Sequence, residues 1–448
     1  MDATDLERQT RTQSGCIPPE LVSRLLERGH AAVVEEQARS GEWFCAREWA
    51  RLLNERGRRA EALDVLGPYL ATGWWTATET TAGLLEGWGR IEEAIELIRA
   101  RMALGHPMAL ESYARLLARH GRAQEAFTHL QPHIDDPSLA RALVDVAVAA
   151  GRNKEAAALL AARVRADHRC DGPWCCRGLD TAIGLLATIR ERQGRVDEAI
   201  TLLRRRETTS VNGRNQLADL LARHGRIEDL RAYAATEDLG DAAQRLAELL
   251  EEHGDVEGAI AVYRQAAEPA AQDPNAAFHL ARLLARHGRG GEAIDVMRAQ
   301  ADTRPGEDWI LHALADLCLD QGRAGDGLAH LDDLRARRGG EERWDLFWMR
   351  LPLIAASAGA DTAVEQARAH PEGNTWYAAK DIAELLADAG RIGEAVAVLE
   401  PHAPANRRAL AGYLIDLGRT DDAVAVLRQP SPEPPQPVVG PWHDEPPF

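Results

Sequence analysis

One sequence motif recurs along the chain: an apolar helix end, then Gly-Arg, two variable residues, an acidic residue and Ala. It reads LLNERGRRAEAL, LLEGWGRIEEAI, LLARHGRAQEAF, VAAGRNKEAA, TIRERQGRVDEAI, LLARHGRGGEAI and LLADAGRIGEAV. The glycines of this motif and its variants, called turn glycines below, lie 28 to 43 residues apart: Gly29, Gly57, Gly89, Gly121, Gly151, Gly194, Gly225, Gly254, Gly288, Gly322, Gly359, Gly390 and Gly418. Self-similarity at a period near 30 predicts an all-α solenoid of about 12–13 antiparallel helix pairs rather than one globular core.

Each residue of the repeated motif has a predicted structural role. Ahead of Gly288, apolar residues recur at i, i+3, i+4 and i+7, which is the stripe of an amphipathic helix, and the period resumes after it. Glycine supplies the positive φ that ends the first helix, and the acidic residue favours the start of the second. The alanine five residues after each glycine is expected to let the two helices approach closely: Ala62, Ala94, Ala126, Ala156, Ala199, Ala259, Ala293, Ala395 and Ala423.

Prolines mark where helices are expected to end. Five of them follow the turn glycine by 11 or 12 residues, which predicts short second helices of about three turns: Pro68, Pro132, Pro371, Pro401 and Pro430. Pro352 is expected to end or kink its helix and to make the unit near 340–359 irregular.

The pattern resembles the tetratricopeptide repeat family, in which two antiparallel helices form a unit of about 34 residues. The resemblance rests on a Leu-Ala pair in the first helix, such as Leu280-Ala281, on the turn glycine and on the alanine of the second helix. Several units are shorter than 34 residues, and the Asp-Pro-Asn opening occurs once, at Asp273-Pro274-Asn275. The chain therefore resembles a degenerate array of actinobacterial type. Because repeats contact only their neighbours, truncation after Gly390 is expected to leave the remainder folded.

The resemblance implies a concave groove lined by first helices, into which residues six and two positions before each turn glycine project. These positions form local patches of one sign, since residues spaced i, i+4 share a helix face. The predicted groove residues are Arg51, Arg115, Arg119, Arg282 and Arg286 with Glu248, Glu252, Asp316 and Asp320. The alternative is that they are solvated faces that exchange weak salt bridges.

A subgroup of this family holds acidic peptide ends in a carboxylate clamp, and Arg47, Arg51 and Asn54 could serve a similar purpose. The lysines and second asparagine that the subgroup uses are missing from this chain. We therefore count Arg47 among the groove candidates without assigning a clamp.

Three segments fall outside the repeat rule. Residues 1–17 are predicted to form a flexible polar arm that precedes a solenoid spanning 18–429. A loop insertion is expected near 165–178, within the longest interval between glycines. Residues 430–448 hold many prolines without lysine or arginine, which is typical of a disordered acidic tail.

The insertion carries the candidate metal ligands. His168, Cys170, Cys175 and Cys176 are residue types that zinc prefers, but their spacing lacks the C-x2-C pair of a zinc knuckle. A reactive thiol and an ordinary loop are the alternatives. We accordingly expect neither a metal nor another cofactor.

An aromatic cluster is the other candidate site. Trp344, Phe347 and Trp348 recur at helical spacing against a background of 5% aromatic residues. They are expected either to pack as an apolar face inside the solenoid or to form an exposed patch for a partner.

Composition and motifs narrow the function. The net charge of −17 argues against nucleic acid, and no long apolar run predicts a membrane span. The six cysteines are too sparse for a disulfide framework, and phosphate-loop, HExxH and GxSxG motifs are missing from the sequence. We therefore predict a cytoplasmic bacterial protein that is not an enzyme.

The function that these observations favour is a scaffold that binds proteins, peptides or helical partners in its groove. One alternative is a regulatory or sensing subunit whose tail or cysteine-containing insertion acts as a switch. Another is a helical-repeat RNA-binding protein, as in the related pentatricopeptide arrays. Self-association through the aromatic patch is a further expectation.

Overall fold

The computed structural model describes residues 2–13, 15–165, 175–205, 211–236, 240–267, 274–304, 306–337, 340 and 342–429. Every regular element within these ranges is helical, from α1 to α28 with two 3-10 turns, so the predicted all-α class is confirmed. No helix in this part of the chain is both long and apolar enough to cross a membrane.

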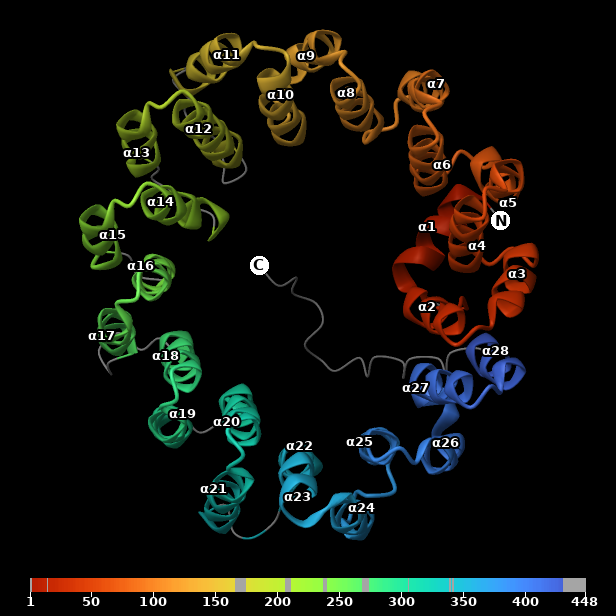
Figure 1. The fold of residues 1–448 in the computed structure, drawn as a ribbon, viewed down its shortest axis with the longest axis vertical. Helices are drawn as coiled ribbons and strands as arrows, with labels where there is room; N and C mark the ends of the chain where they lie inside the picture. The colour runs from red at the N-terminus through yellow and green to blue at the C-terminus, as the bar shows by residue number, and fades with distance from the viewer. Residues whose placement is uncertain are drawn as a thin grey trace, which may run out of the picture. The chain divides into compact units, whose positions relative to one another are not determined.

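The helices follow one another along the chain as labelled in Figure 1. The first six are α1 Ala3–Thr12, α2 Pro19–Glu27, α3 Ala31–Arg39, α4 Trp43–Glu55, α5 Arg59–Ala71 and α6 Trp75–Gly87. Next come α7 Ile91–Ala103, α8 Ala109–Arg119, α9 Ala123–Leu130, η1 Gln131–His133, α10 Pro137–Ala149, α11 Asn153–Arg165, α12 Cys175–Arg192, α13 Val196–Arg204, α14 Val211–Arg223, α15 Ile227–Ala234, α16 Asp241–Glu252, α17 Val256–Ala267, α18 Pro274–Arg286, α19 Gly290–Thr303 and α20 Asp308–Asp320. The last are α21 Ala324–Arg337, α22 Trp344–Phe347, α23 Arg350–Ala358, α24 Ala360–Ala369, α25 Trp376–Asp388, α26 Ile392–Leu399, η2 Glu400–His402, α27 Ala403–Asp416 and α28 Thr420–Arg428.

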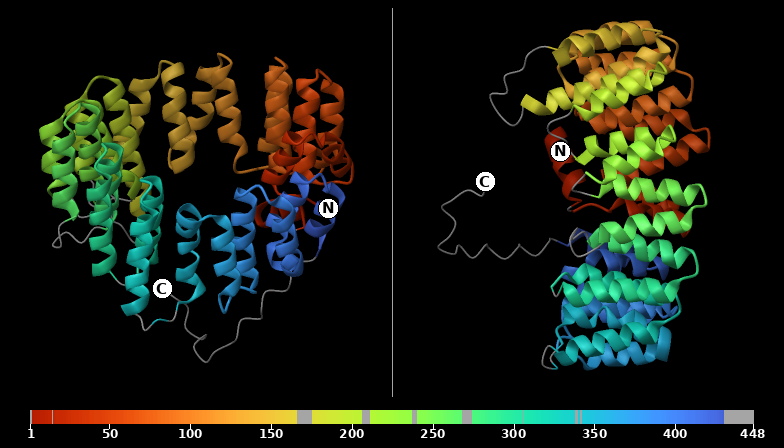
Figure 2. Two further views of the ribbon diagram at one scale, coloured as in Figure 1. Left: turned by 60° about the horizontal axis from the view of Figure 1, so that its bottom comes forward. Right: turned by 90° about the vertical axis from the view of Figure 1, so that its left-hand side faces the viewer.

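The chain divides into two compact units. The first consists of Met1–Leu84 together with Cys318–Phe448, and the second is Leu85–Leu317. Within each unit, successive helices stack side by side and alternate in direction (Figure 2). The sequence predicted one continuous solenoid over 18–429 and did not indicate this division.

Each of the thirteen turn glycines has a positive φ and lies between the two helices of a pair, as predicted. At Gly288, where φ is 75°, the amide of Arg289 bonds the carbonyl of Leu284 at 2.8 Å and the glycine amide bonds that of Ala285 at 3.1 Å. This is a Schellman arrangement, which satisfies the last carbonyls of α18 and requires a residue that tolerates the left-handed region.

The arginine that follows the glycine in the repeated motif has a role that was not predicted from the sequence. Arg289 stands immediately before α19, and its Nε and Nη2 each lie 2.7 Å from a carboxylate oxygen of Glu292. Its Nη1 lies 2.8 Å from Oε1 of Glu257, in the preceding pair. Arg122 makes the same two kinds of contact, with Glu125 and Glu92. The arginine therefore joins the start of its own second helix to the start of the preceding one.

The alanines of the repeated motif are buried, as expected for residues at which the two helices of a pair approach closely. Ala126 and Ala199 are fully inaccessible to solvent, and the other members of the set are 1% exposed or less. A residue with a single methyl group at this position leaves room for the facing helix, which is consistent with close packing within each pair.

The prolines behave as expected in all but one of the described cases. Pro132 and Pro401 lie in the 3-10 turns after α9 and α26, and Pro371 follows the end of α24. Pro68, in contrast, lies inside α5, which continues to Ala71. Pro68 is on an exposed face, so water can hydrate the carbonyl that its missing N–H leaves unbonded. Pro430 lies outside the described residues.

Part of residues 1–17, the segment predicted to be a flexible polar arm, is helical. Ala3–Thr12 forms α1, whose first turn is closed by reciprocal bonds between Asp2 and Asp5. Leu6 on this helix is 1% exposed, and Glu7 accepts a hydrogen bond of 2.7 Å from Nε1 of Trp74. Buried Leu6, with Cys16 and Ile17 at the end of the segment, and one long-range hydrogen bond thus hold a segment whose composition is mostly polar.

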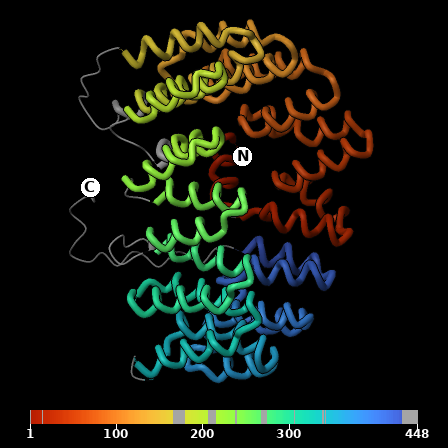
Figure 3. The backbone as a smooth tube through the Cα atoms, turned by 60° about the vertical axis from the view of Figure 1, so that its left-hand side comes forward, coloured from red at the N-terminus to blue at the C-terminus, as the bar shows by residue number. Residues whose placement is uncertain are grey.

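Within the first unit, helices from the two ends of the array pack against each other. Figure 3 shows helices of the N-terminal end (red) beside helices of the C-terminal end (blue), and Figure 1 labels α2 next to α27, which are in direct contact. Arg24 of α2 and Arg28, which immediately follows that helix, both bind Asp416 at the end of α27. Arg428 Nη2 donates to Gln37 Oε1 at 2.6 Å. Terminal repeats of a linear array usually present a solvated outer face, whereas these cover one another.

Candidate functional site

Two of the predicted groove arginines join neighbouring repeats. Arg119 lies 2.8 and 2.9 Å from the carboxylate oxygens of Glu86, and His120 Nε2 lies 2.8 Å from Glu86 Oε1. Arg286 and His287 hold Glu251 in the same way. In both cases the glutamate stands three residues before the turn glycine of the preceding pair. These arginines are therefore committed to contacts that stack the repeats, and a role in partner binding stays a prediction.

The other predicted groove residues have nearby partners in most cases. Arg51 lies 2.8 Å from Glu48 and Arg47 lies 3.0 Å from the same residue, while Arg115 pairs with Glu111 at 2.9 Å. Arg245 holds Glu248 and Glu252, and His312 lies 2.9 Å from Asp316.

Arg282 and Asp320 are exposed and make no ion pair within the described residues. The guanidinium carbon of Arg282 lies 5.7 Å from the ring centre of Phe278. Exposed pairs of the kind that the other candidates form contribute about 1 kcal/mol or less each, so they are poor evidence for a specific groove.

The cysteine insertion contributes little to a described site. His168 and Cys170 lie outside the described residues, and Cys175 and Cys176 begin α12 with side chains that are also outside them. Among the described residues no group of three or more His, Cys, Asp or Glu side chains is placed to hold a metal ion. Cys16 and Cys45 are buried, and burial raises the pKa of the Cys16 thiol to about 11, which keeps it protonated and unreactive at neutral pH.

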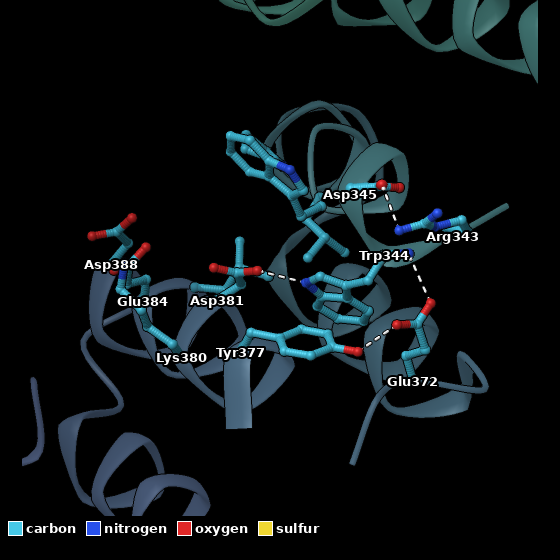
Figure 4. A pocket seen from close by; sticks show the side chains of 13 residues that line it. Arg343, Trp344, Asp345, Glu372, Tyr377, Lys380, Asp381, Glu384 and Asp388 are labelled. Atoms are coloured by element: carbon cyan, nitrogen blue, oxygen red, sulfur yellow. Dashed lines mark hydrogen bonds and ion pairs between the residues drawn. The ribbon is translucent and has the colours of Figure 1, made fainter. Parts of the chain in front are cut away.

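A surface pocket forms around the predicted aromatic cluster. It has a volume of about 660 Å³ and lies between the segment that contains α22 and the start of α23 and the face of α25 (Figure 4). Its lining consists of Arg343, Trp344, Asp345, Trp348, Leu351 and Pro352 on one side and Glu372, Tyr377, Lys380, Asp381, Glu384, Leu385 and Asp388 on the other. Pockets of this size accept a small molecule or a few residues of a peptide.

Trp344 is fixed at the base of this pocket. Its backbone N–H donates to Glu372 Oε1 at 3.0 Å, and its indole Nε1 donates to Asp381 Oδ2 at 2.7 Å. The side chain is 4% exposed and packs edge-on to His370, with ring centres 5.3 Å apart. The hydroxyl of Tyr377 donates to the other oxygen of Glu372 (Figure 4). The aromatic wall is therefore held by hydrogen bonds that join residues of two successive repeats.

The local sequence explains how the two walls arise. Pro352 lies in the first turn of α23, and its ring excludes a helical carbonyl at Trp348, four residues earlier. The regular helical hydrogen bonding is interrupted there, so 344–347 forms a separate single turn before α23, although Trp348 and Met349 keep helical φ and ψ. This interruption lies within residues 340–359, the unit for which the sequence predicted an irregularity. On α25, the residues from Asp381 to Asp388 that line the pocket recur at i, i+3, i+4 and i+7, which places them on one helix face.

The pocket is acidic. Five carboxylates (Asp345, Glu372, Asp381, Glu384 and Asp388) against Arg343 and Lys380 give it a formal charge of −3. Burial raises the pKa of Asp381, and the hydrogen bond from Trp344 opposes that rise. The hydroxyl of Tyr377 and the backbone N–H of Trp344 lower the pKa of Glu372. Glu384 and Asp388 are exposed at the rim.

The sequence predicted only one wall of this site. Trp344 and Phe347 are buried at 4% and 7% exposure, which supports the packed face rather than an exposed patch for these two residues. Trp348 is half-buried and lines the pocket. Tyr377 and the acidic residues of α25 were missed because they belong to the next repeat. The available signal was the acidic spacing on the predicted helix that follows.

Comparisons with known proteins found similar chains among solved structures. No protein-family model matches the sequence, and no curated protein matches it. Among solved structures, the chain is similar to one titled as Naa15/Naa10 bound to HypK-THB, with 15% identity over 95% of this chain and 67% of that chain and a TM-score of 0.49. It is also similar to yeast Tom70, with 10% identity, coverage of 87% and 96%, and a TM-score of 0.32. A tetratricopeptide repeat protein from Parabacteroides merdae gives 17% identity, coverage of 54% and 95%, and a TM-score of 0.25.

The repeated turn geometry, the buried alanines and the paired helices define the architecture independently of those similarities. Each unit of the described chain consists of consecutive antiparallel helix pairs that contact their neighbours. The described part of the chain is therefore an all-α protein built from repeated antiparallel helix pairs.

Proposed function

We propose that the protein is a non-enzymatic scaffold that binds a segment of another protein at the pocket between α22–α23 and α25. The observation that carries this proposal is the pocket itself, in which aromatic side chains fixed by hydrogen bonds lie beneath a rim of charged groups. Apolar walls with a few placed polar groups are typical of recognition sites, and tryptophan and tyrosine are enriched where binding energy concentrates.

The chemistry of the pocket favours binding over catalysis. Its two most buried carboxylates, Glu372 and Asp381, accept hydrogen bonds from Tyr377 and Trp344, and these bonds fix the aromatic wall. No serine, cysteine or histidine lines the cavity, so the usual pairing of a nucleophile with a histidine base is missing from its described lining. The acidic lining also disfavours the alternative of RNA, since it would repel a phosphate backbone.

The test is capture of partners from the native host with the full chain as bait, followed by mass spectrometry. We expect the wild type to retain a reproducible protein partner and the Trp348→Ala variant to lose it. Trp309→Ala is the matched control, because Trp309 is 41% exposed on α20 and lies outside the pocket lining.

The outcomes separate clearly. Equal capture by wild type and Trp348→Ala would place recognition elsewhere on the molecule. Failure of the wild type to retain any protein above an untagged control would contradict the scaffold function as a whole. Circular dichroism and thermal unfolding of each variant establish that lost binding does not reflect lost structure.

A further inference from the structure

We infer that the pocket recognises an arginine side chain in a basic segment of the partner, with the guanidinium held between an aromatic face and the acidic face of α25. This inference rests on the proposed function and specifies the chemistry of the partner. It also assigns a specificity role to Trp348, Glu384 and Asp388, which lie on opposite walls of the same cavity.

The acidic face of α25 supplies the charge. Asp381, Glu384 and Asp388 recur at i, i+3 and i+7, so the three carboxylates follow one side of the helix from the base of the pocket to its rim. Glu384 and Asp388 are exposed, while Asp381 is half-buried with one oxygen occupied by the indole of Trp344. A cationic side chain that enters along this face meets carboxylates at successive depths.

The cations already present do not neutralise this face. Lys380 lies 3.6 Å from Glu384, and Arg343 lies 3.3 Å from Asp345, with both pairs about half exposed or more. Such pairs contribute about 1 kcal/mol or less, because water screens them and long side chains lose freedom on pairing. Asp388 is exposed, and the ion pairs among the described pocket residues do not include it. A net charge of −3 therefore remains for a ligand to compensate.

The aromatic side of the pocket favours guanidinium over a simple ammonium. Trp348 is half-buried and contributes an indole to the cavity, and Tyr377 in the first turn of α25 contributes a second ring whose hydroxyl donates to Glu372. A planar guanidinium stacks on such a ring and also binds a carboxylate through two parallel N–H donors. An ammonium is more strongly hydrated and cannot form the two-donor fork.

The chain contains this arrangement already filled elsewhere. The guanidinium carbon of Arg152 lies 4.1 Å from the ring centre of Phe127, while its Nε and Nη2 lie 2.8 and 2.6 Å from the two oxygens of Glu155. One arginine thus combines an aromatic face and a bidentate carboxylate on these helices. The pocket presents both groups around a cavity of about 660 Å³.

The experiment measures binding of a defined probe to the full chain by fluorescence anisotropy. The probe is a fluorescein-labelled glycine-serine nonapeptide that carries two arginines, and its matched partner carries citrulline at both positions. Citrulline keeps the planar shape and removes the charge. We expect the citrulline peptide to bind at least about tenfold more weakly, because two charge-assisted contacts are lost.

Variants locate the interaction. Glu384→Gln/Asp388→Asn removes two rim charges without touching the hydrogen bonds of Trp344, and we expect it to weaken the arginine peptide about tenfold. Glu365→Gln/Asp421→Asn makes the same charge change at exposed positions outside the pocket and should leave binding unchanged. Trp348→Leu keeps apolar volume but removes the ring, and it should weaken the arginine peptide more than the citrulline peptide.

Three results would overturn the inference: no binding of the arginine peptide to the wild type, equal binding of the citrulline peptide, or equal effects of the pocket and control charge variants. The inference can fail while the scaffold function survives, namely when Trp348→Ala still abolishes capture of the natural partner. If that capture is absent as well, both proposals fail together.

Discussion

Nε of Arg24 lies 2.8 Å from Oδ1 of Asp416, although 392 residues separate them in the sequence. Arg28 reaches the same oxygen at 2.9 Å, and the side chain of Asp416 is only 3% exposed. The contact raises the pKa of Arg24, chiefly through the hydrogen bond to Asp416. A buried carboxylate that is held by two arginines from another helix joins α2 to α27.

Replacing Asp416 with asparagine should weaken the fold. The substitution keeps the shape but removes the charge that two guanidinium groups share, which leaves Arg24 partly buried without its counter-ion. We expect a loss of about 1–3 kcal/mol in the free energy of unfolding, measured by urea denaturation of the full chain. Arg28→Ala should cost less, about 1 kcal/mol or below, because Arg28 is 53% exposed. Equal effects of the two variants would show that burial does not set the strength of this contact.

Gly412 offers a test of the same interface by size alone. A Cβ at this position would lie 3.0 Å from Nη1 of Arg24 and 3.5 Å from Cδ2 of Leu21, whereas one at Gly393 would meet nothing within 4 Å. Both glycines lie inside helices, where alanine is intrinsically preferred by about 0.5–1 kcal/mol. Gly393→Ala should therefore stabilise the protein in thermal unfolding, and Gly412→Ala should not. An equal gain in both variants would mean that the Arg24 side chain gives way at no cost.

The glutamates between repeats predict a pH dependence. Arg119 lowers the pKa of Glu86 below its ordinary value of 4.5, and Arg286 does the same for Glu251. A carboxylate with a lowered pKa stabilises the fold above its unfolded value, and this contribution is lost as the pH falls through the lowered value. Glu86→Gln/Glu251→Gln should thus reduce the free energy of unfolding by about 1 kcal/mol per site at neutral pH.

Denaturant unfolding at a series of pH values checks this expectation. The gap between the wild type and the glutamine variant should close once the pH is well below 4.5, where both glutamates are protonated in either state. A gap that persists unchanged in acid would assign the stabilisation to shape rather than charge. Glu365→Gln, at an exposed position, serves as the control and should show no gap at any pH.

The buried alanine of the repeated motif predicts an upper limit on the size of the side chain at this position. Ala126 is inaccessible to solvent on α9, so leucine at this position should overpack the contact within the pair and cost about 1–3 kcal/mol. Ala100→Leu on α7 is the control, because Ala100 is exposed. Thermal unfolding of both variants measures the difference, and a stable Ala126→Leu protein would show that the paired helices can separate without penalty.

Local features of the fold could be predicted because single residues determine them. A glycine with positive φ ends a helix wherever it occurs, so Gly288 and its equivalents were identified from the sequence. The small alanine of the second helix was likewise predictable from its fixed distance to the glycine. The ion pair between Arg289 and Glu292 was within reach of the same reasoning, since the two are three residues apart.

Contacts between repeats could not be predicted in this way. Arg119 and Glu86 are 33 residues apart, and whether they meet depends on how one pair is rotated on the next. The acidic wall of the pocket has the same origin, because Trp344 and Asp381 come from successive repeats. Periodicity establishes that neighbouring pairs stack, but the register of their side chains follows from packing in three dimensions.

The contact between α2 and α27 also limits how this array can change in length. A further helix pair placed after α28 would have to displace α2 from α27, and one placed before α2 would have to displace α27. Duplication at an end would therefore separate these two helices and break the Arg24–Asp416 pair. Addition of a repeat at either end of the array is therefore expected to cost this buried ion pair.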